Sequence, residues 1–294
     1  MELQWPLILF TAFVAWAGGL LATQGIFALK KEGDKTQMTA TITTLVLLVI
    51  GGIAVFMHLQ HWERIFNGFG HLSSGITQEL IGIVLMIVVL VLIFLQLRKE
   101  DGKIPAWLAV VAIVVALGTV IVTAHSYMMA SRPAWNTFMW ALALIGNACI
   151  LGPLTFIFLD AVKVKEDKPA SFGLVALIGA VLNALGSLLY VFVANGSSSQ
   201  FAQITYYYDP TEPMREMVDA ASTVNAFANP VLVWVAIVII GVVVPIVAAF
   251  LGSKKPTASN WMIWSCVGLV CALIGAICIR VLFFQMGASV FIFY

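Results

Sequence analysis

Eight long apolar runs decide what this chain folds into before any motif is considered. They cover residues 6–29, 39–59, 76–97, 105–124, 136–162, 171–194, 226–251 and 260–284. About 20 apolar residues in an α-helix cross the roughly 30 Å hydrocarbon core of a bilayer. Only 10% of the residues are charged, against about 25% in a typical soluble domain. The sequence therefore predicts an all-α integral membrane protein, a bundle of eight transmembrane helices.

Seven spans with one re-entrant segment are the alternative to eight full spans. The first run is too long for a removable signal peptide, and it has neither the basic flank nor the small-residue cleavage site of one. We expect residues 1–294 to form a single transmembrane domain with external loops at 60–75, 125–135 and 195–225. The last of these loops is long enough to serve a function, although a solvated, disordered loop is an equal alternative.

Basic residues are distributed unevenly between the two sets of loops, which predicts the orientation of the chain. Eleven of the fifteen follow the first, third, fifth and seventh runs: Lys30, Lys31, Lys35, Arg98, Lys99, Lys103, Lys163, Lys165, Lys168, Lys254 and Lys255. The opposite side carries Arg64, Arg132, Arg215 and Arg280. Because loops rich in lysine and arginine stay in the cytoplasm, we expect both termini on the external side of a cytoplasmic (inner) membrane.

The sequence contains no pattern typical of a metal site or a nucleotide site. All four cysteines fall inside predicted spans and have no metal-ligand spacing: Cys149, Cys266, Cys271 and Cys278. They are interpreted as small buried hydrophobic residues. We therefore expect no metal bound by this chain.

Titratable side chains gather in one turn, MHLQHWERIFNGFGHLSSGITQELIG, between the second and third runs. It contains three of the four histidines and a glutamate that opens the third run: His58, His61, His71 and Glu79. Histidine exchanges protons near neutral pH. An ionisable residue inside a membrane is costly and usually functional. The alternative for Glu79 is an interfacial polar residue, because this cost falls near the membrane surface.

A histidine and a carboxylate beside an apolar cavity suit chemistry that exchanges protons within the membrane. Oxidation of a quinol is such a reaction, because the ring hydroxyls need acceptors that carry their protons away. A haem held by His58 and His125 is the alternative. The cytoplasmic half of the chain has no histidine, however, so we expect no haem.

Two short blocks resemble the anchor subunit of respiratory dimethyl sulfoxide reductases, the DmsC family. The first is His58-Leu59, then Arg64-x-Phe66-Asn67, then Glu79 at the start of the next span. The second is Tyr127 followed by Pro133-Ala134-Trp135-Asn136-Thr137, which is similar to the family's Tyr…Pro-x-Trp-x-Thr turn. Eight spans with both termini outside are also what the family shows.

The resemblance implies a membrane anchor that also oxidises quinol within an oxidoreductase complex. It would bind menaquinol as substrate and release menaquinone during anaerobic electron transport, without a redox cofactor of its own. The electrons would pass to a four-cluster ferredoxin-like iron–sulfur subunit and then to a molybdenum bis-pterin catalytic subunit. Iron–sulfur clusters and molybdopterin would belong to those partners. The lipid bilayer is the remaining partner, and no nucleic acid is implied.

The resemblance also implies roles for individual residues. His58 and Glu79 match the family's quinol-site histidine and glutamate. Arg64 matches a loop arginine that docks the iron–sulfur subunit or shapes the site. His61 is a rival for the role of His58, because Gln60-His61-Trp62 replaces the small residue and proline expected after His-Leu.

Three further residues are candidates for partner docking or for shaping the site: Asn67, Tyr127 and Trp135. The spacing from Asn67 to Glu79 is shorter than in the family pattern, so the register of this loop is open. We favour His58 over His61 because it lies closer to the hydrocarbon, where a quinone ring would stop.

Three other functions remain open. An anchor of the polysulfide- or nitrite-reductase type (NrfD-like) would share the fold and the kind of partner. A purely structural anchor would leave quinol oxidation to another subunit. A transporter is disfavoured because the middle of the membrane is poor in charge and no internal repeat is evident. The terminal electron acceptor is not encoded in this chain.

Overall fold

The computed structural model describes residues 3–58, 71–100, 102–201, 222 and 224–290. Within these ranges eight helical segments are long and apolar enough to cross a membrane. They are α1 (Trp5–Lys30), α2 (Asp34–Phe56), α3 (Gly75–Leu97), α4 (Ala106–Ser126), α5 (Phe138–Lys163), α6 (Ala170–Gly196), the continuous pair η4 (Val231–Val243) and α8 (Val244–Lys254), and α9 (Ala258–Gln285). The predicted all-α bundle of eight spans is confirmed.

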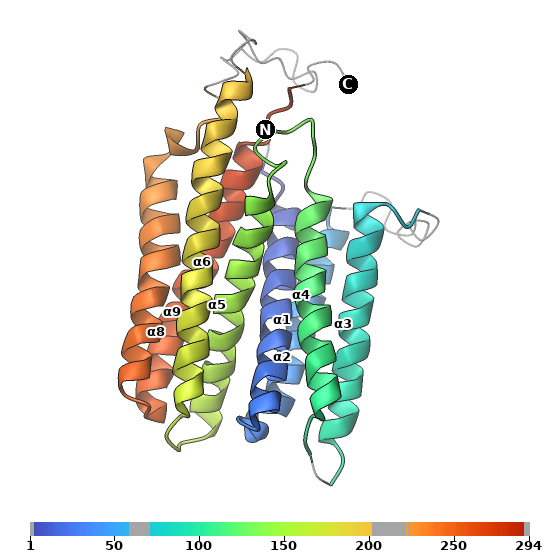
Figure 1. Ribbon diagram of the computed structural model, residues 1–294, viewed down its shortest axis with the longest axis vertical. Helices are drawn as coiled ribbons and strands as arrows, with labels where there is room; N and C mark the ends of the chain where they lie inside the picture. The colour runs from blue at the N-terminus through green and yellow to red at the C-terminus, as the bar shows by residue number, and fades with distance from the viewer. Residues whose placement is uncertain (1–2, 59–70, 101, 202–221, 223, 291–294) are drawn as a thin grey trace.

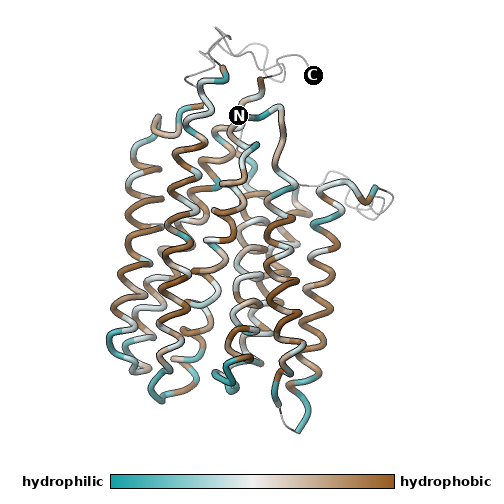
Figure 2. The backbone as a smooth tube through the Cα atoms, in the orientation of Figure 1, coloured by the Kyte–Doolittle hydropathy of each residue, from teal (hydrophilic) through white to brown (hydrophobic). Residues whose placement is uncertain are grey.

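The helices run side by side along the long axis of the molecule (Figure 1). Helix α1 begins and α9 finishes at the same end of the bundle, which we call the terminal end. The opposite end carries Lys35, Lys168 and Lys254, and we call it the lysine end. Two short 3-10 helices, η2 (Ser197–Phe201) and η3 (Ala226–Ala228), lie at the terminal end. Figure 2 shows the hydrophobic colour along the middle of the helices and the hydrophilic colour gathered at both ends, as a membrane-spanning bundle requires.

Helices α1 and α5 form the centre of the bundle, and α3 stands at its edge. The most apolar stretches of α1 and α5 are each 72% buried, whereas that of α3 is only 28% buried. α3 is nevertheless the most hydrophobic span, with a mean hydropathy of 3.2. Because its apolar side chains are exposed in the protein alone, α3 is the helix with the widest face toward lipid.

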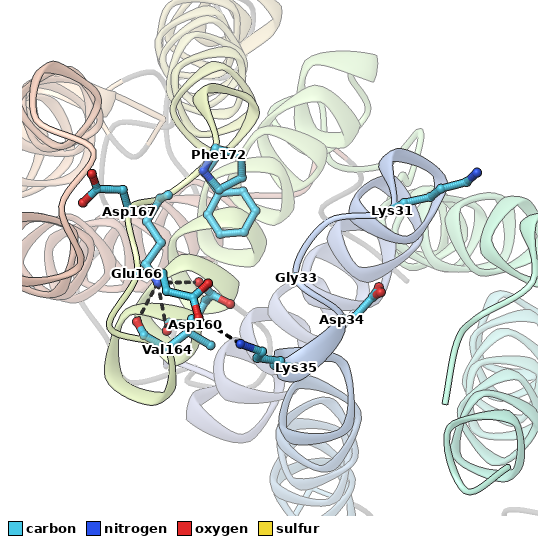
Figure 3. A pocket seen from close by; sticks show the side chains of 11 residues that line it. Lys31, Gly33, Asp34, Lys35, Asp160, Val164, Glu166, Asp167 and Phe172 are labelled. Carbon is cyan, nitrogen blue, oxygen red and sulfur yellow. Dashed lines mark hydrogen bonds and ion pairs between the residues drawn. The ribbon is translucent and has the colours of Figure 1, made fainter. Parts of the chain in front are cut away.

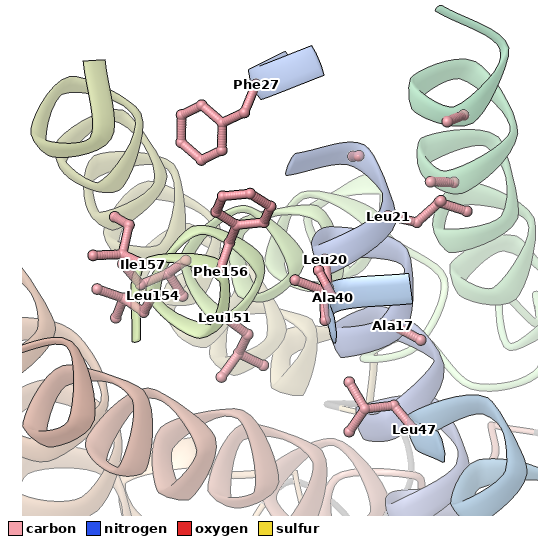
Figure 4. Close-up of a cluster of buried hydrophobic side chains, with 14 of the residues drawn as sticks. Ala17, Leu20, Leu21, Phe27, Ala40, Leu47, Leu151, Leu154, Phe156 and Ile157 are labelled. Atoms are coloured by element: carbon pink, nitrogen blue, oxygen red, sulfur yellow. The ribbon is translucent and has the colours of Figure 1, made fainter. Parts of the chain in front are cut away.

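A hydrophobic core fills the space among α1, α2 and α5 (Figure 4). Phe27 and Phe156 pack with their ring centroids 4.9 Å apart, and Leu20 and Leu151 are fully buried beside them. The lipid tails around the bundle are as apolar as this core, so van der Waals packing rather than water exclusion holds the helices together.

Small residues allow α5 and α6 to pack closely. A Cβ atom added to Gly179 of α6 would lie 1.9 Å from the carbonyl oxygen of Cys149 in α5. The two helix backbones therefore touch at this point. Close approach at small residues is the usual way in which membrane helices gain packing energy.

The seventh span is not one regular α-helix. Its first half, η4, is a π-helix, and its second half, α8, is an α-helix with Pro245 in its first turn. In α-helical register the carbonyl of Gly241 would accept a hydrogen bond from the N–H of residue 245, which proline lacks. Instead, that carbonyl accepts a hydrogen bond of 2.9 Å from the Asn183 amide of α6. The change of helix type thus occurs where proline removes a donor.

We predict that Gly179→Ala destabilises the bundle by about 1–3 kcal/mol, because its methyl group forces α5 and α6 apart. Gly118→Ala in α4 is the matched control, since a Cβ atom at Gly118 meets nothing within 4 Å. The control should be neutral or slightly stabilising, because alanine favours helix more than glycine does. Thermal unfolding in detergent measures both variants. Equal midpoints for the two variants would contradict the prediction.

Candidate functional site

Glu79 lies buried between α3 and α4 near the terminal end. Its side chain is 6% exposed, and its carboxylate accepts a hydrogen bond from the hydroxyl of Ser126, the last residue of α4. Glu79 is the fifth residue of α3, roughly 6 Å below the start of the helix at 1.5 Å per residue. The structure therefore places this carboxylate within the first turns of a membrane-spanning helix.

Two glycines explain why the carboxylate meets Ser126. Gly75 and Gly82 lie on the same face of α3 as Glu79, at helical spacings of four and three residues. A Cβ atom on Gly75 would lie 2.7 Å from Cβ of Ser126, and one on Gly82 would lie 2.9 Å from the Thr119 hydroxyl. Side chains at these positions would push α4 away, so the glycines bring the hydroxyl-bearing face of α4 against Glu79.

The described histidines lie at the terminal end, but they do not bond to Glu79. His58 follows the end of α2 and is exposed, with its backbone N–H donating to the Val55 carbonyl at 3.0 Å. His71 precedes α3 and His125 precedes Ser126 in α4, and both side chains are exposed. In the part of the chain that the structure describes, the partner of the Glu79 carboxylate is a serine.

Three candidate residues of the loop between α2 and α3, His61, Arg64 and Asn67, lie outside the described residues. The choice between His58 and His61 therefore stays a matter for experiment.

The other two candidates, Tyr127 and Trp135, meet in an aromatic cluster at the end of α9. Trp135 stacks on Phe283 with centroids 4.5 Å apart, and its indole N–H donates to the Phe283 carbonyl at 2.6 Å. Tyr127 packs edge-on against Phe283 and Phe284, at 6.1 Å and 6.4 Å. The loop between α4 and α5 is thereby fixed to the last turn of α9.

Tyr127 also links Glu79 electrostatically to a buried arginine. Burial raises the pKa of the Tyr127 phenol well above its usual range. The Glu79 carboxylate raises this pKa further, and the guanidinium of Arg280 opposes the rise. The phenol therefore stays protonated and lies within electrostatic reach of both charged groups.

Arg280 is fully buried inside the bundle, in the terminal half of α9. Its Nε donates to the Thr11 hydroxyl at 3.0 Å, and its Nη2 donates to the Thr11 carbonyl at 3.2 Å. Its Nη1 donates to the Asn147 side-chain oxygen at 2.8 Å and to the Ala276 carbonyl at 2.6 Å. Within the described residues, no carboxylate forms an ion pair with this guanidinium, so neutral dipoles solvate the charge.

The hydrogen bonds continue from Arg280 across the bundle. Asn147 donates to Asn183 at 2.8 Å, and Asn183 donates to the Gly241 carbonyl left without a donor by Pro245. We call Thr11, Arg280, Asn147, Asn183 and Gly241 the polar junction. It joins α1, α9, α5, α6 and η4 through groups that would each be costly to leave unpaired in hydrocarbon.

Sequence reasoning counted Arg280 only as a charge on the side of the termini and did not identify the junction. One signal was present: an isolated arginine inside an apolar run, with isolated asparagines in the fifth and sixth runs. Which of these faces meet depends on the lateral arrangement of the helices, which hydropathy does not reveal.

A second cluster of charges lies at the lysine end, around a pocket of about 240 Å³ (Figure 3). Asp160 and Lys168 form a buried ion pair of 2.7 Å, and the Thr36 hydroxyl donates to Asp160 at 2.6 Å. The backbone N–H of Lys168 donates to the Pro256 carbonyl at 2.6 Å. The cluster thus ties the first turn of α2 and the last turn of α5 to the α5–α6 and α8–α9 loops.

The rim of this pocket carries one ion pair, which is exposed to solvent. Lys35 and Glu166 form an exposed ion pair of 3.0 Å, and the hydrogen bond from Lys35 holds the pKa of the Glu166 carboxyl below its usual range. Because the buried charges Asp160 and Lys168 satisfy each other, we interpret the cluster as a fastening of helix ends and loops.

The fold and the site define an integral membrane protein with eight spans, which buries ionisable groups toward both ends of the bundle. The residues described contain no group of three His, Cys, Asp or Glu side chains that could hold a metal ion. A family model, the DMSO reductase anchor subunit (DmsC), matches residues 1–286. The chain belongs to this family and is the membrane anchor of a DMSO reductase-type complex with catalytic and iron–sulfur subunits. A comparison with curated proteins finds no match.

We predict that Asn147→Leu destabilises the protein by about 1–3 kcal/mol or more, because it leaves donors of Arg280 and the Asn183 oxygen unpaired in a dry interior. The double variant Asn147→Leu, Arg280→Met should be less destabilised than the sum of the single variants, since the buried charge is gone. Thermal unfolding in detergent measures the cycle. Simple additivity would show that the junction does not act as a unit.

We also predict that Asp160→Asn costs about 3–5 kcal/mol, because Lys168 is left as a buried charge without its partner. The matched control is Glu166→Gln, the same chemical change at the exposed ion pair. It should have little effect, because solvent screens that pair. Thermal unfolding midpoints compare the stability of the two variants. If Glu166→Gln is as destabilised as Asp160→Asn, the buried pair has no special role.

Proposed function

We propose that this subunit oxidises menaquinol at the terminal end of α2, α3 and α4 and passes the electrons to the iron–sulfur subunit of its complex. The observation that carries the proposal is Glu79, a buried carboxylate on the bundle's most lipid-exposed helix. A lipid-soluble quinol reaches such a position laterally, without leaving the hydrocarbon. Membership of the DMSO reductase anchor family supports the same reaction.

In the proposed reaction Glu79 is the general base. Before the reaction, a hydrogen bond from the Ser126 hydroxyl stabilises the negative charge of the Glu79 carboxylate. The carboxylate then takes a proton from a ring hydroxyl of menaquinol. The quinol loses both hydroxyl protons and an electron pair and leaves as menaquinone. We assign the other proton to His58, whose exposed side chain lies at the end of α2. His61 is the rival for this second role.

We further propose that the terminal end faces the external side of the inner membrane. The lysine-rich loops all lie at the opposite end, and basic loops remain cytoplasmic. The iron–sulfur subunit then docks externally, on the α4–α5 loop. There Arg132 lies 4.5 Å from the ring centroid of Trp135, and Trp135 is held in turn by α9.

This orientation has an energetic consequence. Quinol protons are released on the external side, where the molybdenum subunit consumes protons in the same space. The proposed reaction is then non-electrogenic, because no net charge crosses the membrane.

We expect Glu79→Gln to lower the menaquinol-driven rate by at least about 10²-fold, the usual contribution of a general base. The variant keeps the shape of the side chain and removes only its basicity. Membranes containing the assembled complex are assayed with a menaquinol analogue. A parallel assay uses an artificial donor that reduces the catalytic subunit directly, and that rate should not change.

Two controls sharpen this test. Glu100→Gln alters an exposed acid just beyond the opposite end of α3 and should leave both rates unchanged. His58→Ala is then compared with His61→Ala, and the histidine whose loss removes only the quinol-driven rate is the second acceptor. If Glu79→Gln and both histidine variants retain the quinol-driven rate, the subunit is a structural anchor and the proposal is wrong.

A further inference from the structure

We propose that two hydroxyl groups of α4 complete the quinol site: Ser126 carries the proton from Glu79 to the surface, and Thr123 holds a quinol oxygen. Both residues lie near the terminal end of α4, three positions apart on one side of the helix. The inference rests on the proposed function, because it gives these residues roles in the reaction assigned to Glu79.

The Ser126 hydroxyl lies between two acceptors. Its oxygen is within hydrogen-bonding distance of the Glu79 carboxylate and, at 2.9 Å, of the Thr123 carbonyl. A hydroxyl has a single proton and so donates to one of them at a time. Beside ionised Glu79 it donates to the carboxylate. Beside protonated Glu79 it accepts from the carboxyl O–H and turns its own proton to the Thr123 carbonyl. Both protonation states of Glu79 are thus hydrogen-bonded without any movement of the helices.

Ser126 also connects the buried carboxylate to the surface. Glu79 is buried, Ser126 is partly exposed, and the preceding residue, His125, is exposed. In the proposed step the carboxyl proton of Glu79 moves to Ser126 Oγ, and the Ser126 hydroxyl proton passes to water or to His125. At Ser126 Oγ one O–H bond forms and another breaks, so Ser126 is unchanged. At Glu79 the O–H bond breaks, so the carboxyl group returns to its ionised state, and the acceptor gains the proton. The net result is one proton moved outward.

Thr123 supplies the second, independent observation. Its side chain is 1% exposed, and its Oγ1 has no hydrogen-bond partner among the described residues. Threonines elsewhere in these helices bond to the carbonyl four residues back: Thr119 does so at 2.8 Å and Thr44 at 2.8 Å. A buried hydroxyl without a partner is costly. A ligand oxygen that binds there would remove this cost.

The position of Thr123 around the axis of α4 agrees with this role. On α4, Thr119 contacts Gly82 of α3, and Val120 contacts Gly18 of α1. Thr123 follows these residues by four and three positions, so it lies between the face toward α3 and the face toward α1. Its hydroxyl is therefore one helical turn deeper than Ser126, on the side nearer the bundle centre. A quinol oxygen bonded there would bring the ring close to Glu79.

The test separates binding from proton transfer with two variants in the assembled complex. Ser126→Ala should lower kcat for the menaquinol analogue at least tenfold with little change in KM, and should alter the solvent isotope effect on kcat. Thr123→Val keeps the shape of the side chain and should raise KM several-fold with little change in kcat. Thr119→Val is the matched control, because that hydroxyl is already bonded to its own helix, and neither parameter should change. The artificial-donor rate should be unchanged throughout.

The outcomes distinguish the inference from the proposed function. If Glu79→Gln loses the quinol-driven rate while Ser126→Ala and Thr123→Val keep wild-type kinetics, the inference is overturned and the proposed function stands. If Glu79→Gln keeps the rate, Glu79 is not the base and this inference is wrong; the proposed function is wrong as well if both histidine variants also keep the rate. Ser126→Gly guards against a packing effect, since it also removes the hydroxyl but occupies less space. Loss of the artificial-donor rate in both serine variants would mean a structural role and would overturn the relay.

Discussion

Hydrocarbon offers no hydrogen bonds, so a polar atom inside this bundle is costly unless the protein itself supplies its partner. The polar junction is the clearest consequence. Pro245 removes a donor from the seventh span, the Asn183 amide takes the place of that donor, and Asn147 connects Asn183 to Arg280. A fully buried guanidinium without an ion-pair partner among the described residues is tolerated because neutral groups from separate helices converge on it. The same convergence holds α1, α5, α6, α9 and η4 in one arrangement.

The two ends of the bundle satisfy their polar groups to different degrees, and this difference supports the proposed position of the quinol site. At the lysine end Asp160 bonds to both Lys168 and Thr36, and Lys35 and Glu166 form an exposed ion pair nearby. At the terminal end the Glu79 carboxylate has one neutral hydroxyl as its described partner, and the Thr123 hydroxyl has none. A fully satisfied cluster suits fastening. A partly satisfied one retains the capacity to bind and to exchange protons.

Much of the fold could be predicted from the sequence, because an apolar run that spans a membrane must match the thickness of its hydrocarbon core. The third run, 76–97, differs from α3 at a single residue, and the position of Glu79 at the start of that span was predicted correctly. The partners of Glu79 and Arg280 could not be predicted. They depend on which helix faces meet, and glycines such as Gly75 determine this through close contacts that a hydropathy pattern does not contain. The π-helix escaped prediction for a related reason, since Pro245 alone does not show that Asn183 will bond to the carbonyl one turn before it.

The distribution of burial separates the centre of the bundle from the edge where we propose that substrate binds. α1 and α5 are the most buried spans. Thr11 of α1 and Asn147 of α5 bond to Arg280, and Cys149 of α5 lies at the close contact with α6. α3 is the least buried span, yet it carries the buried carboxylate. In a bilayer, a substrate that arrives through the lipid can reach an edge helix without separating the core helices. A base on α3 facing the fixed surface of α4 therefore combines lateral access with a defined position for proton transfer, which is the arrangement that the proposed oxidation of menaquinol needs.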